Sequence, residues 1–145
     1  MIVVKEVKTY IQKCKFVDFP SKLYKNNPYF VPYVRIDEMN LFNPKKNVSY
    51  EDCDAKYFLA YKGKKVVGRI AGIVQRLYND KTNEKRLRFS RFDAINDKEV
   101  AKALFDAVEN YAKEMGMDTV HGPLGFNDLD REGLLIEGFD QLSTF

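Results

Sequence analysis

The chain has 145 residues, of which 45% are hydrophobic and 31% are charged. This balance is typical of a globular protein and excludes an intrinsically disordered chain, and the length fits one domain with a buried core. The net charge of +3 is too small to indicate a nucleic-acid partner.

The two cysteines, Cys14 and Cys53, show neither metal-ligand spacing nor a disulfide framework. We therefore expect free thiols, a reducing compartment and no bound metal. Residues 1–6 lack the basic and apolar segments of a signal peptide, and no apolar run approaches the roughly 20 residues that span a bilayer. These features predict a cytoplasmic protein without a membrane partner.

The first third of the chain is predicted to form one strand followed by short helices. Residues 1–8 mix β-branched and charged side chains, as strands often do. Thr9 suits the N-cap of a helix, and Pro20 is expected to open a second, short helix that ends by residue 28. One or two helical turns are expected between residues 35 and 42, and residues 48–54 are interpreted as a loop.

The strongest β pattern begins after this loop. Residues 57–61 and 65–75 are rich in aromatic and β-branched side chains, and they flank a tight turn in which Gly63 can adopt positive φ. Gly68 and Gly72 lie inside the second strand and indicate a bulge or the close approach of another backbone.

A third strand is predicted at residues 86–92, after a polar turn at residues 78–84. Its apolar and basic side chains alternate, and the alternation slips near Ser90, which indicates a bulge. We expect the basic side chains to pair at the surface: Arg86, Arg88 and Arg91 with Glu84 or Asp93.

A long amphipathic helix follows, from residue 97 or 98 to residue 115. Its apolar residues recur at intervals of three and four, Asn96 with Glu99 fits an N-cap arrangement, and Gly116 is placed to end the helix. Residues 118–121 then predict a short strand, which we expect to be parallel to the third strand of the meander.

The remainder, residues 122–145, is predicted to be mainly loop, with one short helical turn near residues 129–134. Asp128, Asp130 and Glu132 faintly resemble a calcium loop, but the position of the required twelfth-residue acid is Phe139. We therefore interpret these acids as turn residues that cap a helix end and pair with Arg131.

The order of elements, and above all residues 57–72, resembles the GNAT N-acetyltransferase superfamily. The sequence is similar in particular to bacterial GNAT-like proteins of mostly unassigned function, on residues 43–47 (Asn-Pro-Lys-Lys-Asn) and 122–133, which begin Gly-Pro-Leu-Gly-Phe-Asn-Asp. The resemblance implies an α/β (α+β) fold with a mixed sheet, in which an antiparallel meander is joined by a parallel strand and flanked by helices. It implies one GNAT-like domain over residues 1–145, lacking the superfamily's last helix and strands, so that the chain is a fragment or is completed by another chain.

The resemblance also implies an activity and a site. A member of this superfamily would transfer an acyl group from acetyl-CoA or another acyl-CoA to an amine on a small molecule or peptide. The residues that would act as bases are Asp93 and His121, and the strand that would hold the donor comprises Phe89, Ser90, Arg91 and Phe92. For His121 we nevertheless expect a half-buried strand histidine bonded to the backbone.

One departure from the superfamily supports an alternative function. The superfamily places a glycine-rich loop before the long helix, where backbone amides close on the coenzyme A pyrophosphate. Here residues 93–97 read Asp-Ala-Ile-Asn-Asp, without glycine and with two carboxylates. The alternative is a non-catalytic GNAT-fold module that binds a ligand or a partner protein. A homodimer through the exposed sheet edge is a further expectation.

An aromatic group near the N-terminus has two possible roles. It could line an acceptor pocket, but we expect it to pack short helices on the sheet. Its members are Tyr24, Tyr29, Phe30, Tyr33 and Phe42.

Overall fold

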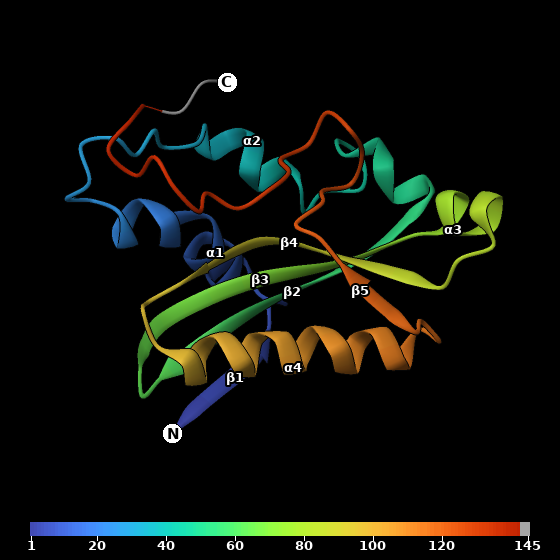
Figure 1. The fold of residues 1–145 in the computed structure, drawn as a ribbon, viewed down its shortest axis with the longest axis horizontal. Helices are drawn as coiled ribbons and strands as arrows, with labels where there is room; N and C mark the ends of the chain where they lie inside the picture. Colours follow the sequence, from blue (N-terminus) through green and yellow to red (C-terminus); the bar gives the residue numbers. More distant parts are fainter. Residues whose placement is uncertain (143–145) are drawn as a thin grey trace.

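The structure is a five-stranded sheet with helices on both faces (Figure 1). The computed structural model describes residues 1–142. The strands lie in the order β1-β2-β3-β4-β5. Their bounds are Ile2–Glu6, Cys53–Lys62, Lys65–Gln75, Arg86–Ala94 and Thr119–His121. Strands β1 to β4 are antiparallel neighbours and β5 is parallel to β4, which confirms the predicted α/β (α+β) class.

Strands β2 and β3 form a long hairpin at the centre of the sheet. Its turn is made by Gly63, which has φ 61°, as predicted. Strand β2 begins before the predicted residue 57, because residues 53–56 pair with residues 72–75 of β3. The predicted loop at residues 48–54 is wrong in detail: a short 3-10 helix, η1 (Val48–Glu51), precedes the strand.

Helix α1 (Tyr10–Leu23) begins with the predicted cap. The Thr9 hydroxyl accepts a hydrogen bond from the Gln12 amide at 3.3 Å, and the Gln12 side chain accepts one from the Thr9 amide at 2.9 Å. This reciprocal capping box satisfies amides that have no partner inside the first turn.

The predicted break before Pro20 is wrong, because α1 continues through it without interruption. In a helix, the N–H of residue 20 would bond to the carbonyl of Phe16, and proline has no N–H to give. The Arg69 side chain supplies the missing donor, with its Nη1 2.9 Å from the Phe16 oxygen. A tertiary contact therefore removes one of the two costs of a helical proline.

Helix α2 (Arg35–Asn40) lies within the predicted segment 35–42. The aromatic group around it packs largely on itself and on the sheet. Tyr24 and Phe30 have ring centroids 4.9 Å apart, and Phe42 lies 4.6 Å from the ring of Tyr57 in β2. These contacts agree with the packing role.

The predicted polar turn at residues 78–84 is wrong, because Arg76–Thr82 form helix α3. Gln75 caps its start, and Asn83 ends it in the left-handed conformation with φ 54°. The side-chain amide of Asn79 donates to the Arg86 carbonyl at 2.8 Å, which fixes the helix against β4. Short polar helices of this kind depend on such contacts more than on an apolar stripe.

The predicted bulge in β4 is confirmed, and it lies at Arg91. Ser90 pairs with Ala71 and Asp93 pairs with Arg69, so β4 has one more residue than β3 across this interval. Arg91 has φ 51°, a left-handed backbone conformation that residues other than glycine, asparagine and aspartate seldom adopt. The extra residue kinks the strand.

Helix α4 (Lys98–Glu114) covers one face of the sheet (Figure 1). Its N-cap is Asp97, whose carboxylate accepts a hydrogen bond from the Glu99 amide at 2.9 Å, so the predicted cap at Asn96 is wrong by one residue. Gly116 ends the helix with φ 72°, as predicted.

The two strand glycines allow α4 to lie close to β3. A Cβ on Gly68 would lie 2.8 Å from the Leu104 side chain, and one on Gly72 would lie 3.0 Å from the Tyr111 ring. The predicted close approach is therefore made by side chains of the long helix.

Two apolar clusters hold the layers together. One lies between the sheet and α4 and includes Phe58, Ile70 and Leu104. The other lies on the opposite face, under α1 and the segment after β5, and includes Phe16 and Phe126. Segments far apart in sequence thus meet on this second face, where α1, α2 and residues 122–142 gather (Figure 1).

Candidate functional site

Strands β4 and β5 separate after a short parallel pairing. The pairing runs only from Arg86 with Thr119 to Arg88 with His121. One further bond follows, from the Leu124 amide to the Phe89 carbonyl at 2.9 Å. Residues 122–142 then leave the sheet on the side of α1 and α2 (Figure 1).

The second half of β4 therefore has one edge that β5 does not cover. The Ile95 amide bonds to the Val67 carbonyl of β3 at 2.9 Å. Because successive residues of a strand turn their amides to opposite edges, Phe92 and Ala94 direct theirs away from β3. This edge lies directly after the bulge at Arg91, so the bulge determines which amides face it.

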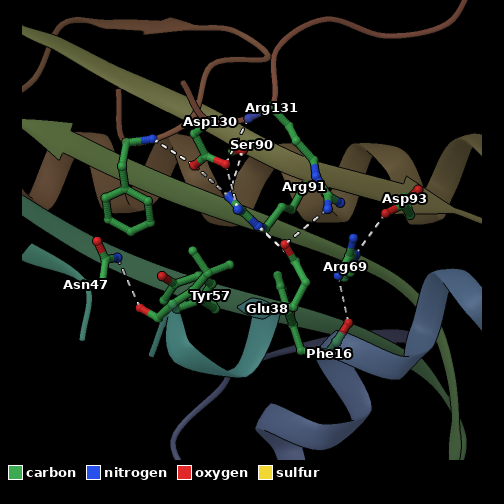
Figure 2. Close-up of polar contacts among 12 residues, drawn as sticks. Phe16, Glu38, Asn47, Tyr57, Arg69, Ser90, Arg91, Asp93, Asp130 and Arg131 are labelled. Carbon is green, nitrogen blue, oxygen red and sulfur yellow. Dashed lines mark hydrogen bonds and ion pairs between the residues drawn. The ribbon is translucent and has the colours of Figure 1, made fainter. Parts of the chain in front are cut away.

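The Arg91 side chain is buried, with 2% of it exposed, and its nitrogens contact two carboxylates. Nε lies 3.2 Å from Glu38 Oε2. Nη2 lies 2.9 Å from Asp130 Oδ1, and Nη1 lies 3.2 Å from Asp130 Oδ2, a bidentate pair. Nη1 also lies 3.3 Å from the Ser90 hydroxyl oxygen (Figure 2). The predicted surface pairing is wrong for this residue.

Asp130 organises the segment after β5. Its carboxylate accepts hydrogen bonds from the amides of Phe126 at 3.0 Å and Arg131 at 2.8 Å. The Arg131 guanidinium lies 3.6 Å from Glu38 and stacks over the Tyr33 ring. The predicted helical turn near residues 129–134 is absent from the described chain. The sequence predicts that the acids of this segment pair with Arg131, but Asp130 pairs with Arg91 instead.

A second buried ion pair lies beside the first. Arg69 is 1% exposed, and its Nε donates to Asp93 Oδ2 at 2.8 Å. Figure 2 shows this pair. Asp93 Oδ1 also accepts a hydrogen bond from the Tyr24 hydroxyl at 3.0 Å. Burial lowers the pKa of Arg69, although the neighbouring carboxylate opposes that shift. Burial, then the charge of Asp93, raises the pKa of Tyr24 well above its usual range.

The two predicted bases do not lie in the same surroundings. Both oxygens of Asp93 already have partners, as described above. His121 is exposed at the end of β5, with its Nδ1 3.2 Å from Arg86 Nη1. Since arginine only donates, Nδ1 is the acceptor in this contact. Their catalytic roles stay predictions.

The predicted donor-binding residues occupy both faces of β4. Phe89 and Phe92 point to the α4 side, where each ring centroid lies 5.0 Å from that of Phe105. Ser90 and Arg91 are buried on the other side. Because these side chains are all engaged, the backbone edge is what this strand offers to a ligand.

A surface hollow of about 370 Å³ lies at the other end of β4, away from the bulge. It is lined by Asn83, Glu84, Lys85, Arg86, Asp118 and Thr119. Arg86 pairs here with Glu84 at 3.0 Å, as predicted from the sequence.

The remaining expectations concern thiols, metals and membranes. Both cysteines are free thiols, and burial raises the pKa of Cys53 to about 11, so this thiol is unreactive at neutral pH. Within residues 1–142, no cluster of three or more His, Cys, Asp or Glu side chains is arranged to hold a metal. No helix in that part of the chain has the length and apolar character needed to cross a bilayer.

Comparison with known proteins identifies the fold. No family model matches the sequence. The protein YghO of Escherichia coli is 34% identical over 137 residues, and the bacterial ceramide synthase of Caulobacter vibrioides is 29% identical over 136 residues. Each alignment covers 92% of this chain and 35% of the relative, so the chain spans about a third of the length of these curated relatives.

Solved structures with a similar fold are acetyltransferases. A tandem GNAT protein from the clavulanic acid pathway has a TM-score of 0.62 at 11% identity, over 83% of this chain and 35% of that one. A predicted acetyltransferase from Clostridium acetobutylicum, solved with acetyl-CoA, has a TM-score of 0.58 at 13% identity, over 83% of this chain and 79% of that one. The chain has the GNAT fold.

In this GNAT fold the start of α4 is occupied by a carboxylate. The Asp97 side chain caps the helix and lies 3.7 Å from Lys62 Nζ. The positive end of the helix dipole is thereby neutralised by the protein itself. The start of α4 therefore does not fit the pyrophosphate of an acyl-CoA.

Several site residues were not predicted from the sequence as partners. Glu38 comes from α2, far from β4 in the sequence, Arg69 from the neighbouring strand β3, and Asp130 from a segment interpreted as a turn. The available signal was a charge inside an otherwise apolar stretch: Arg69 follows residues 65–68 in a strand whose other members are mainly aliphatic. Such a charge is expected to be paired when buried.

The Asp130 pair predicts an acid-dependent loss of stability. Burial alone would raise the pKa of Asp130, but its hydrogen bond with Arg91, the charge of Arg91 and two backbone amides lower the pKa overall. A carboxyl with a lower pKa in the folded state stabilises the fold above its unfolded pKa of about 4, and this stabilisation is lost as the pH falls through the folded value. Urea unfolding between pH 7 and pH 3 should show that loss. Asp130→Asn should flatten the decrease below pH 4, and an unchanged pH dependence would contradict the assignment.

Proposed function

We propose that the chain is an acyl-CoA-dependent N-acyltransferase, which transfers an acyl group to an amine. The observation that supports this most directly is the separation of β4 and β5 beside the bulge at Arg91. It leaves a backbone edge with amides at Phe92 and Ala94, between two strands and next to a polar cluster. Such an edge can hold an extended thioester by backbone hydrogen bonds.

The proposed reaction forms a C–N bond and breaks a C–S bond. The acceptor nitrogen attacks the thioester carbonyl and gives up a proton to a base, and the departing thiolate takes up a proton from solvent. The amide of Phe92 would stabilise the charge on the carbonyl oxygen, and that of Ala94, about 6.6 Å further along the strand, would hold another part of the donor. Asp93, through a water molecule, or His121 would accept the proton, after exchanging the partners described above.

The acceptor is proposed from a relative. The Caulobacter protein that aligns with 92% of this chain is named a ceramide synthase, a name that denotes an amide-forming enzyme. This supports a long-chain amino alcohol as an acceptor to be tested beside small polyamines and peptides. Aminoglycosides also belong in such a panel, since an aminoglycoside acetyltransferase shares the fold with a TM-score of 0.57.

The experiment combines binding with product detection. Acetyl-CoA, a long-chain acyl-CoA and coenzyme A are titrated into the protein, and the melting midpoint is measured. A bound donor should raise it, because binding to the native state stabilises by mass action. Thiol release and amide formation are then measured with the amine panel. If millimolar donor produced no melting shift and no thiol release, the proposal would be contradicted.

Two exposed β5 residues provide a matched pair of variants. If His121 is the base, His121→Gln should lower kcat by about 100-fold or more. Thr119→Ala lies on the same strand, is also exposed, and should leave kcat unchanged. Equal activity of the two variants would leave Asp93 as the proposed base.

A non-catalytic module is the second candidate. The Asp97 carboxylate at the start of α4 favours it, because it occupies the Glu99 amide and places a negative charge where a pyrophosphate would have to lie. In that case a partner could pair with the outer edge of β5, and a second copy of this chain is one such partner. A protein that binds no donor but elutes as a dimer would favour this candidate.

A further inference from the structure

The bulge of β4 lies at a residue that combines a strained backbone with a buried, charged side chain. Arg91 has φ 51°, and a side chain with Cβ is disfavoured there relative to glycine. Such conformations persist where the surrounding structure over-determines them. At Arg91 the surrounding structure is the pair of carboxylates that the guanidinium contacts.

We propose that Arg91 is a positioning residue, which with Glu38 and Asp130 sets the bulge and fastens the loop of residues 122–131 to β4 beside its uncovered edge. We call these three residues the Arg91 clamp. The proposal rests on the proposed function for its catalytic consequence, and its structural content stands apart from that function.

The clamp joins three segments that have little else in common. Glu38 belongs to α2, Arg91 to β4, and Asp130 to the loop after β5. Their side chains are 6%, 2% and 14% exposed. Hydrogen bonds between buried charged groups are strong and costly to break on one side. The clamp is therefore suited to fix the relative positions of these segments.

The loop is built around the clamp carboxylate. Two loop amides, those of Phe126 and Arg131, bond to Asp130, which itself bonds to Arg91. Gly125 lies so close to this carboxylate that a Cβ at that position would overlap it. An alanine at residue 125 should therefore displace Asp130 without changing any charge.

The consequence for the site follows from the geometry of the strand. Because of the residue inserted at the bulge, the backbone amide of Phe92, rather than that of Arg91, faces the edge that β5 leaves uncovered. If the clamp is released, the bulge can relax and the loop can separate from β4. The donor would then lie against a mobile edge, and a small displacement of reacting atoms lowers the rate strongly.

Amide hydrogen exchange tests the structural content without any substrate. Asp130→Asn, Gly125→Ala and Arg91→Gly are compared with the unaltered protein. Arg91→Gly relieves the backbone while removing the guanidinium. Exchange at the amides of Phe126 and Arg131 should accelerate at least about tenfold relative to the amides of β2 and β3. Equal exchange would overturn the proposal, because a bulge set by the backbone alone needs no clamp.

The control is an arginine with similar partners at the surface. Arg35 contacts Asp18 through Nε at 2.7 Å and Nη2 at 3.4 Å, with 53% of its side chain exposed. Arg35→Lys should leave exchange in the loop unchanged, whereas Arg91→Lys should accelerate it by less than Arg91→Gly, since lysine keeps the charge but not the bidentate geometry. Loop exchange that responds equally at both positions would count against the proposal.

Kinetics test the catalytic consequence. In Gly125→Ala we expect kcat to fall at least about tenfold, with a smaller change in the KM for the amine. Arg91→Lys should keep a higher kcat than Arg91→Gly. A donor that does not bind the unaltered protein would refute the proposed function and leave the exchange result as the test of the clamp. Normal kcat in a variant with accelerated loop exchange would refute the positioning role alone.

Discussion

Replacing Asp93 with asparagine should lower the free energy of unfolding by about 3–5 kcal/mol. Arg69 is 1% exposed and its nearest counter-charge is this carboxylate, 2.8 Å from Nε. Removing the negative charge leaves a buried cation with only the neutral Phe16 carbonyl and the remaining amide oxygen as acceptors. A buried charge without a partner is among the most costly defects in a protein core. Urea unfolding followed by circular dichroism measures the loss.

Two comparisons separate the buried pair from an ordinary ion pair. Asp18→Asn breaks a pair with Arg35 that is largely exposed, and should cost less than about 1 kcal/mol. Replacing both partners, as in R69M/D93N, removes the cation together with the anion and should be less destabilised than D93N alone. A double variant that is less stable than D93N would show that Arg69 acts mainly through Phe16.

Leu104→Ala should cost about 2–5 kcal/mol, because Leu104 is fully buried between α4 and the sheet. Gly68→Ala should cost about 1–3 kcal/mol by overpacking the same space. The Cβ that it adds would lie 2.8 Å from the Leu104 side chain and 3.0 Å from that of Val100. Together the two substitutions exchange volume across one contact, so the double variant should be more stable than the sum of the single losses predicts.

A double-mutant cycle measures this compensation. The four proteins are unfolded in urea, and a favourable coupling of about 1 kcal/mol or more is expected between residues 68 and 104. The matched cycle pairs Gly68→Ala with Leu87→Ala. Leu87 is also fully buried, but none of its atoms is among those nearest to a Cβ at residue 68. Coupling that is equal in both cycles would contradict a direct contact between β3 and α4 at Gly68.

The sheet and its long helix could be predicted because their signals are local. Alternation in β4, the turn at Gly63 and the apolar stripe of α4 each depend on residues a few positions apart. Helix α3 was missed because its polar sequence has no stripe, and its stability comes from contacts such as that of Asn79 with the Arg86 carbonyl. The continuation of α1 through Pro20 was missed because Arg69, which donates to the Phe16 carbonyl in place of the missing N–H, lies 53 residues from Phe16.

The candidate site was predictable as a place but not as a set of contacts. The slip of alternation near Ser90 located the bulge, and the order of elements located the end of β5. The partners of Arg91 could not be inferred, because Glu38 lies 53 residues before it and Asp130 39 residues after it. The alternation of apolar and basic residues predicted a surface position for Arg91, whereas the bulge directs its side chain into the protein interior.

These long separations bear on the order in which the molecule assembles. The central hairpin closes over two residues, but the Arg91 clamp requires α2, β4 and the segment after β5 to have already met. Loop-closure entropy makes such distant contacts form late, after the local ones have reduced the search. The chain can thus complete its scaffold before the uncovered edge of β4 takes its final form. Substitutions in the clamp should then act on how long the native state lasts more than on how fast it is reached.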